Sequence, residues 1–109
     1  MDNPISEVFR KAEMLETALT ENKKRGEALA EAERVYRVAL SAKILELRDG
    51  GYPATLIGDL ARGDREVAKL KFDRDCAEVV YESSQEAINV YKKVIDVLRE
   101  QIDREWRSA

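Results

Sequence analysis

The chain has 109 residues, of which 38% are charged and 6% aromatic, with five glycines and two prolines. This length suits one domain, and such a composition is typical of long helices and coiled coils. Nineteen basic against twenty-two acidic residues give a net charge of -3, which excludes a global attraction to nucleic acid or to anionic membranes.

Several kinds of chemistry lack their usual side chains. A single cysteine, Cys76, excludes an intramolecular disulfide and zinc-binding cysteine pairs. The absence of histidine removes the commonest metal ligand and the usual general base near neutral pH. We therefore expect no enzymatic activity, no cofactor and no metal site, and we expect Cys76 to be a small buried packing residue.

No segment of the sequence indicates secretion or a membrane. The N-terminus lacks a basic region followed by an apolar run, and no apolar stretch approaches the roughly 20 residues that span a bilayer. The sequence predicts a soluble, cytoplasmic protein, in a host cell's cytoplasm if the chain is not the cell's own.

A first long helix is predicted over residues 4–48. Asn3 is a strong N-cap and Pro4 suits the first helical position. Apolar residues at heptad spacing define two seams. The first seam contains Val8, Leu15, Asn22, Leu29, Tyr36 and Lys43, and the second contains Ala12, Leu19, Gly26, Glu33, Leu40 and Leu47.

The seams are weak at Asn22 and Gly26. Three interpretations remain open: local loosening or a close helix approach, a kink or second bend, and register specification by a buried Asn22.

A bend over residues 49–64 follows. Gly50 and Gly51 are expected to end the first helix through a left-handed residue, and residues 55–61 fit a short helix. Asp64 is then a good N-cap for a second long helix over residues 65–107. Its seams contain Val67, Arg74, Tyr81, Ile88, Ile95 and Ile102, and Leu70, Ala77, Ser84, Tyr91 and Leu98.

Two long helices of similar length joined by a short bend predict one all-α domain, a long antiparallel helical hairpin. Apolar residues beside the seams remain for another copy to cover, so we expect a homo-oligomer, most simply a four-helix bundle from two hairpins. The expected contacts are Val35, Ala39, Val80, Ala87, Val94 and Trp106. Trp106 is expected either in such a contact or over the end of the bundle near Val8 and Phe9.

The bend is also the best candidate for a ligand or partner site. Two helix starts there present free N–H groups suited to an anion, although Asp59 and Asp64 oppose one. The candidate contacts are Tyr52, Thr55, Arg62, Arg65 and Lys69. The alternative is a capped structural corner.

Charged residues elsewhere predict structural ion pairs. Arg74 and Glu33 lie on the two seams at similar levels of the hairpin, so we expect them to pair, directly or through a water. The alternative is that the long Arg74 side chain turns outward into solvent. An acidic ridge contains Asp75, Glu78, Glu82 and Glu86. The hairpin brings Arg37 and Arg34 to the level of Asp75 and Glu78, so we expect interhelical ion pairs there, in preference to a carboxylate metal site.

Two resemblances bear on function. Residues 44–70 resemble the tri-helical pattern of resolvase-type DNA-binding domains, in which a helix ends at glycine and a short helix leads by a tight turn into a recognition helix. Here the second long helix opens with Asp64, Arg65 and Glu66, whose acids oppose phosphate contacts.

Residues 42–64, Lys71-Phe-Asp-Arg-Asp75 and Gln101-Ile-Asp-Arg-Glu-Trp106 resemble small helical proteins of unknown function from phages and prophages of Gram-positive bacteria. This resemblance implies a cytoplasmic phage accessory role in replication, recombination or the countering of host defence. Our first hypothesis is a non-enzymatic interaction protein that binds a copy of itself and a host or phage protein. The alternatives are a sponge for nucleotides or other small molecules, and a helix-turn-helix DNA-binding protein.

Overall fold

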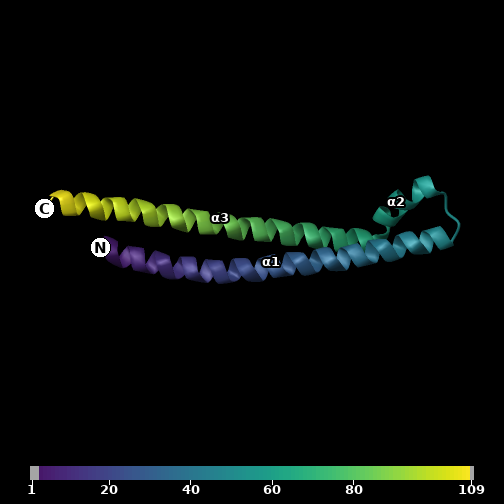
Figure 1. The fold of residues 1–109 in the computed structure, drawn as a ribbon, viewed down its shortest axis with the longest axis horizontal. Helices are drawn as coiled ribbons and strands as arrows, with labels where there is room; N and C mark the ends of the chain where they lie inside the picture. The colour runs from purple at the N-terminus through teal and green to yellow at the C-terminus, as the bar shows by residue number, and fades with distance from the viewer. Residues whose placement is uncertain (1–2, 109) are drawn as a thin grey trace. The chain divides into compact units, whose positions relative to one another are not determined.

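The structure, a computed structural model, describes residues 3–108 and is helical over nearly all of them. Helix α1 spans Pro4–Asp49, α2 spans Ala54–Gly63 and α3 spans Arg65–Ser108 (Figure 1). No strand occurs in the described range. The predicted all-α class is confirmed, as are the three predicted helices.

The chain divides into two compact units, which we describe separately. Unit 1 contains the N-terminal half of α1, up to Arg25, and the C-terminal half of α3, from Tyr81. Unit 2 is Gly26–Val80, which holds the rest of α1, all of α2 and the start of α3.

The start of α1 is capped as its sequence predicts. The Asn3 side-chain Oδ1 accepts a hydrogen bond from the Ile5 N–H at 2.9 Å, and the Asn3 carbonyl accepts one from the Glu7 N–H at 3.0 Å. Pro4, which has no N–H to satisfy, is the first helical residue. From there α1 continues through Gly26 to Asp49, so that glycine does not interrupt the helix.

A Schellman motif ends α1. Tyr52 donates its backbone N–H to the Leu47 carbonyl at 3.2 Å, and Gly51 donates to the Arg48 carbonyl at 3.0 Å. Gly51 has a φ of +79°, a left-handed conformation that costs any residue with a Cβ free energy. The predicted left-handed helix end is thus confirmed and is located at Gly51.

Gly51→Ala is expected to lower the free energy of unfolding by about 1 kcal/mol, because alanine is strained at this φ. The measurement is urea denaturation followed by circular dichroism. Gly63→Ala is the matched control, since Gly63 ends α2 at an ordinary φ and an added Cβ there meets no atom within 4 Å. The control is expected to be neutral or stabilising, and equal losses for the two variants would contradict the motif's role.

The core of unit 2 forms where α2 packs against α1. Ile57 and Ala61 of α2 and Leu47 of α1 are buried together, and Leu40 and Ile44 pack against them. Ala61 is completely buried. Spacings of three and four residues place each helix's contributions on one face, so α2 is held as a third packed element.

Within unit 2, α1 and α3 run antiparallel. Glu33 of α1 contacts Arg74 of α3, and Lys43, ten residues later on α1, contacts Asp64, ten residues earlier on the chain. Unit 2 is therefore a helical hairpin whose bend contains α2 (Figure 1).

The predicted α3 seams are confirmed, because every one of their residues is buried or half-buried. On α1 the first seam is likewise confirmed, but the second is wrong at Ala12 and Leu19, which are exposed. Lys11 and Ala18 are half-buried in their place. The half-buried residues Ala18, Asn22 and Gly26 are separated by two successive spacings of four residues. A strict heptad alternates spacings of three and four, so the additional spacing of four rotates the buried face of α1 away from the predicted seam.

Unit 1 has almost no core. Among its described residues only Ile88 is buried, at 7% exposure, whereas unit 2 buries five hydrophobic residues. The large apolar side chains of unit 1 that remain exposed are Ile5, Phe9, Met14, Leu19, Val90, Val97 and Trp106. A helix pair with so little buried surface has little to stabilise it by itself.

Candidate interaction surface

The structure brings the predicted pair Glu33 and Arg74 together. Arg74 Nε lies 3.3 Å from Glu33 Oε2, and both side chains are about one-quarter to one-third exposed. The Arg74 guanidinium also lies 5.7 Å from the centre of the Tyr36 ring, within reach of a cation–π interaction. This cluster joins α1 to α3 inside unit 2.

Glu33 is also held from its own helix. Arg37 Nε donates to Glu33 Oε1 at 2.8 Å, and this hydrogen bond lowers the pKa of Glu33, while partial burial opposes the shift and the charge of Arg74 adds to it. Glu33 Oε2 and Arg74 Nε are buried without a well-aligned hydrogen bond, so their contact is an ion pair only. We assign the cluster a structural role.

The expected partners of the acidic ridge are wrong. Asp75 pairs with Lys71 at 3.0 Å and with Arg74 at 3.1 Å, both on its own helix, and Glu78 lies 3.8 Å from Arg74. Arg34 and Arg37 instead pair with glutamates one turn away on α1. Neighbours three or four residues apart meet at little entropic cost, so local pairs replaced the expected interhelical ones.

The five candidate residues of the bend do not gather into a site. Tyr52, Thr55, Arg62, Arg65 and Lys69 are all exposed, and no described interaction joins any two of them. Two of the three cations are neutralised on their own helices. Arg62 pairs with Asp59 at 2.7 Å, and Lys69 pairs with Asp73 at 3.1 Å.

Asp64 caps α3 and links it to α1. Its Oδ2 accepts a hydrogen bond from the Val67 N–H at 3.2 Å, as the sequence predicts, and its Oδ1 lies 3.5 Å from Lys43 Nζ. The Val67 hydrogen bond lowers the pKa of Asp64, burial opposes the shift, and the Lys43 charge adds to it. The capping role of Asp64 was predicted from the sequence. Its ion pair with Lys43 was not predicted, because Lys43 lies 21 positions earlier in the chain.

The lowered pKa of Asp64 predicts a pH dependence. A carboxyl group whose pKa is lower in the folded state stabilises the fold above its unfolded pKa, near 3.8, and this contribution is lost as the pH falls through the folded value. Asp64→Asn keeps a capping acceptor but does not titrate. Urea denaturation is expected to show wild type more stable near neutral pH, with the gap closing below pH 3.8. A gap of constant size would contradict the assignment.

A mostly apolar and largely exposed line follows the outer side of α3 in unit 1. Residues at alternating spacings of four and three share one face of a helix. Five residues of α3 have these spacings, and we call them the outer line: Ser83, Ala87, Val90, Val94 and Val97. Val90 is 48% exposed and Val97 is 60% exposed, while Val94 is half-buried.

The other residues expected in an oligomer contact belong partly to this surface. Ala87 and Val94 lie in the outer line, and Val80 is 41% exposed on the preceding turns of α3 in unit 2. Val35 and Ala39 of α1 are half-buried in unit 2. Cys76, which we expected to be buried, is exposed because it lies outside both α3 seams.

Trp106 is 74% exposed and covers little. It borders a hollow of about 290 Å³ in unit 1, lined by Asn3, Pro4, Ile5, Ile102, Glu105 and Trp106 itself. The ring therefore lies at the first turn of α1, one turn before the expected neighbours Val8 and Phe9. The hollow adds an apolar surface to the open end of unit 1.

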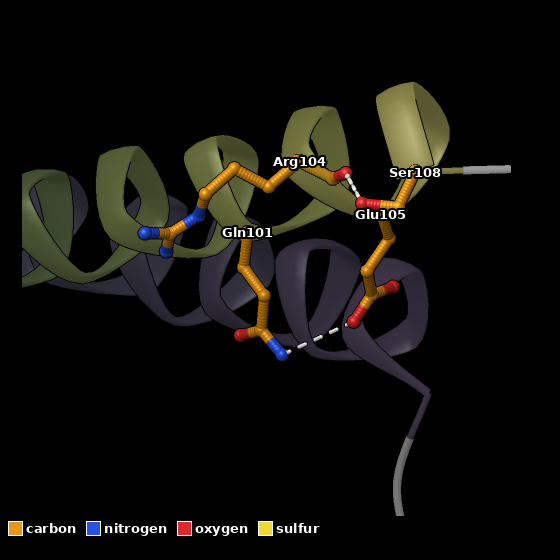
Figure 2. Close-up of a pocket in the computed structure, with 4 residues that line it drawn as sticks. All are labelled: Gln101, Arg104, Glu105 and Ser108. Atoms are coloured by element: carbon orange, nitrogen blue, oxygen red, sulfur yellow. Dashed lines mark hydrogen bonds between the residues drawn. The ribbon is translucent and has the colours of Figure 1, made fainter.

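A second pocket at this end is formed by one helix. Its lining residues Gln101, Arg104, Glu105 and Ser108 all belong to α3 and are exposed. Figure 2 shows Gln101 directed toward Glu105, with a hydrogen bond of 3.4 Å, and the Arg104 side chain extending away from them. Ser108 Oγ donates to the Arg104 carbonyl at 2.9 Å. Because these lining residues all lie on one helix, the surface forms no enclosed binding space.

Other site classes are not represented in the part of the chain that the structure describes. Residues 3–108 contain no group of three or more Cys, Asp or Glu side chains placed to hold a metal ion, and no helix among them is long and apolar enough to cross a membrane. A scan against protein-family models gave no match, and neither curated proteins nor solved structures gave one.

Proposed function

We propose that this chain is a non-enzymatic interaction protein that associates with itself and binds a second protein. In this proposal α1 and α3 form one antiparallel hairpin, and two hairpins assemble into a four-helix bundle. The exposed apolar side chains of unit 1 cover each other in this bundle. The resemblance to small phage proteins suggests that the second partner is a host or phage protein, met in the host cytoplasm.

The exposed apolar surface of unit 1 carries the proposal. Among the described residues of unit 1, only Ile88 is buried, whereas seven large apolar side chains are at least 38% exposed. Burying such side chains contributes roughly 25 cal/mol per Å² of apolar surface, which is the main source of stability for a helix pair. Contact with another copy supplies this burial.

The bend offers a second, separate apolar surface in unit 2. Leu56 and Leu60 lie one turn apart on α2 and are 50% and 42% exposed, and Tyr52 is 52% exposed before them. The adjacent face of α2 is already occupied by the core residues Ile57 and Ala61. An apolar surface of this kind suits a protein partner, whereas the paired Arg62 and Lys69 favour neither phosphate nor DNA.

Affinity capture with a matched variant tests the second partner. The wild-type chain and the double variant Leu56→Glu/Leu60→Glu are used as baits in lysates of phage-infected Gram-positive cells. We expect the wild type to retain a protein that the variant loses, while both keep the same helicity and the same mass in solution. Identical retained proteins for both baits would overturn the role of the bend.

A further inference from the structure

Two charged residues beside the outer line, Glu86 and Lys93, indicate which kind of partner covers it. Glu86 and Lys93 are seven residues apart on α3, so they lie on the same side of the outer line, two turns from each other. Within residues 3–108 neither forms an ion pair, although the acidic and basic residues of α3 at positions 69–78 are extensively paired. Both charges therefore remain available to a partner.

When two copies of α3 pack antiparallel, the acid of each copy lies near the base of the other. The two-fold axis of such a pair is perpendicular to the helices and passes between residues 86 and 93. It brings Glu86 of each copy near Lys93 of the other, so the contact occurs twice. In a parallel pair the two-fold axis runs along the helices, so the charges of the two copies lie on opposite flanks of the contact and neither Glu86–Lys93 pair forms. The charge order thus distinguishes the two directions.

We propose that a second copy of the chain covers the outer line, with the two α3 helices antiparallel and Ala87 of each copy opposite Val90 of the other. In this register Ser83 faces Val94, and the two Glu86–Lys93 pairs flank the apolar contact. This inference rests on the self-association proposed above and specifies its direction and register. Small and β-branched side chains along the line allow the two helices to approach closely.

Charge exchange tests the flanking pairs. Glu86→Lys and Lys93→Glu are each expected to raise the dimer dissociation constant about tenfold at low salt, because two attractive pairs become repulsive. The double variant Glu86→Lys/Lys93→Glu is expected to restore the wild-type constant. Lys92→Glu is the matched control, since Lys92 is exposed on the side of α3 away from the outer line and does not lie three or four residues from Glu86 or Lys93. A double variant as weak as the single ones would overturn the pairing.

Cysteine cross-linking tests the register independently. In a Cys76→Ser background, an equimolar mixture of Ala87→Cys and Val90→Cys chains is expected to give the mixed disulfide dimer under mild oxidation. Val97→Cys chains by themselves are expected to stay uncross-linked, because antiparallel pairing separates the two cysteines by several turns. Rapid cross-linking through Val97→Cys would show parallel pairing and overturn the proposal.

Different results would contradict self-association and the antiparallel register. A wild-type chain that remains monomeric at micromolar concentration contradicts self-association itself, and with it the register. A dimer that shows neither charge rescue nor the mixed disulfide contradicts only the antiparallel register, and self-association stands.

Discussion

Ile57→Ala is expected to lower the free energy of unfolding by about 2–4 kcal/mol, measured by urea denaturation with circular dichroism. Ile57 is 9% exposed and belongs to the cluster that joins α2 to Leu47 of α1. Truncation removes buried methyl and methylene groups and leaves a cavity that α2 cannot easily fill, since Ala61 beside it is small. The variant is expected to loosen α2 from unit 2.

Leu56→Ala is the control for this variant. Leu56 precedes Ile57 on the same helix and is half exposed, so its truncation removes a similar volume without opening a cavity in the core. The expected loss is below about 1 kcal/mol. If both variants lost equal stability, the packed face of α2 would have been assigned wrongly.

Val90→Glu is expected to raise the dimer dissociation constant about a hundredfold or more, measured by sedimentation velocity. The two-fold contact would place two carboxylates, one from each copy, in an apolar interface without partners. The helicity of the monomer should change little, because Val90 is 48% exposed within the chain.

Asn89→Glu introduces the same charge one residue away, on an exposed position outside the outer line. We expect it to leave the dimer constant within a few-fold of wild type. If both variants dimerise like wild type, another face of the chain makes the contact.

The features predicted most accurately from the sequence are those set by local chemistry. Asn3 and Asp64 cap their helices because their side chains accept hydrogen bonds from N–H groups two or three residues later. Gly51 ends α1 because glycine adopts a positive φ without strain. Such features depend on a few neighbouring residues, so one sequence suffices to find them.

The wrong predictions concern two kinds of feature. One is the position of the buried face along a long helix, and the other is the choice between several possible ion-pair partners. Leu19 was placed in a seam because a strict heptad was continued past Asn22, whereas the two four-residue steps turn the buried face of α1. Arg34 and Arg37 were assigned to α3 by level along the hairpin, but glutamates one turn away on α1 reach them first. In contrast, Glu33 and Arg74 were predicted to pair and the structure places them in contact.

The candidate sites were only partly predictable. The glycines and helix starts of the bend suggested an anion site, but the aspartates that neutralise Arg62 and Lys69 lie within one turn of them on the same helices. The heptad reading recognised Ala87 and Val94 as exposed apolar residues. It overlooked Val90 and Val97, which complete the outer line, because a two-seam scheme assigns them to the solvent side.

Sedimentation equilibrium of the wild-type chain over a micromolar concentration series tests the central claim, that unit 1 is completed by a second copy. Self-association predicts a mass that rises with concentration toward twice the 12.4 kDa of one chain. A mass of 12.4 kDa throughout the series would contradict it.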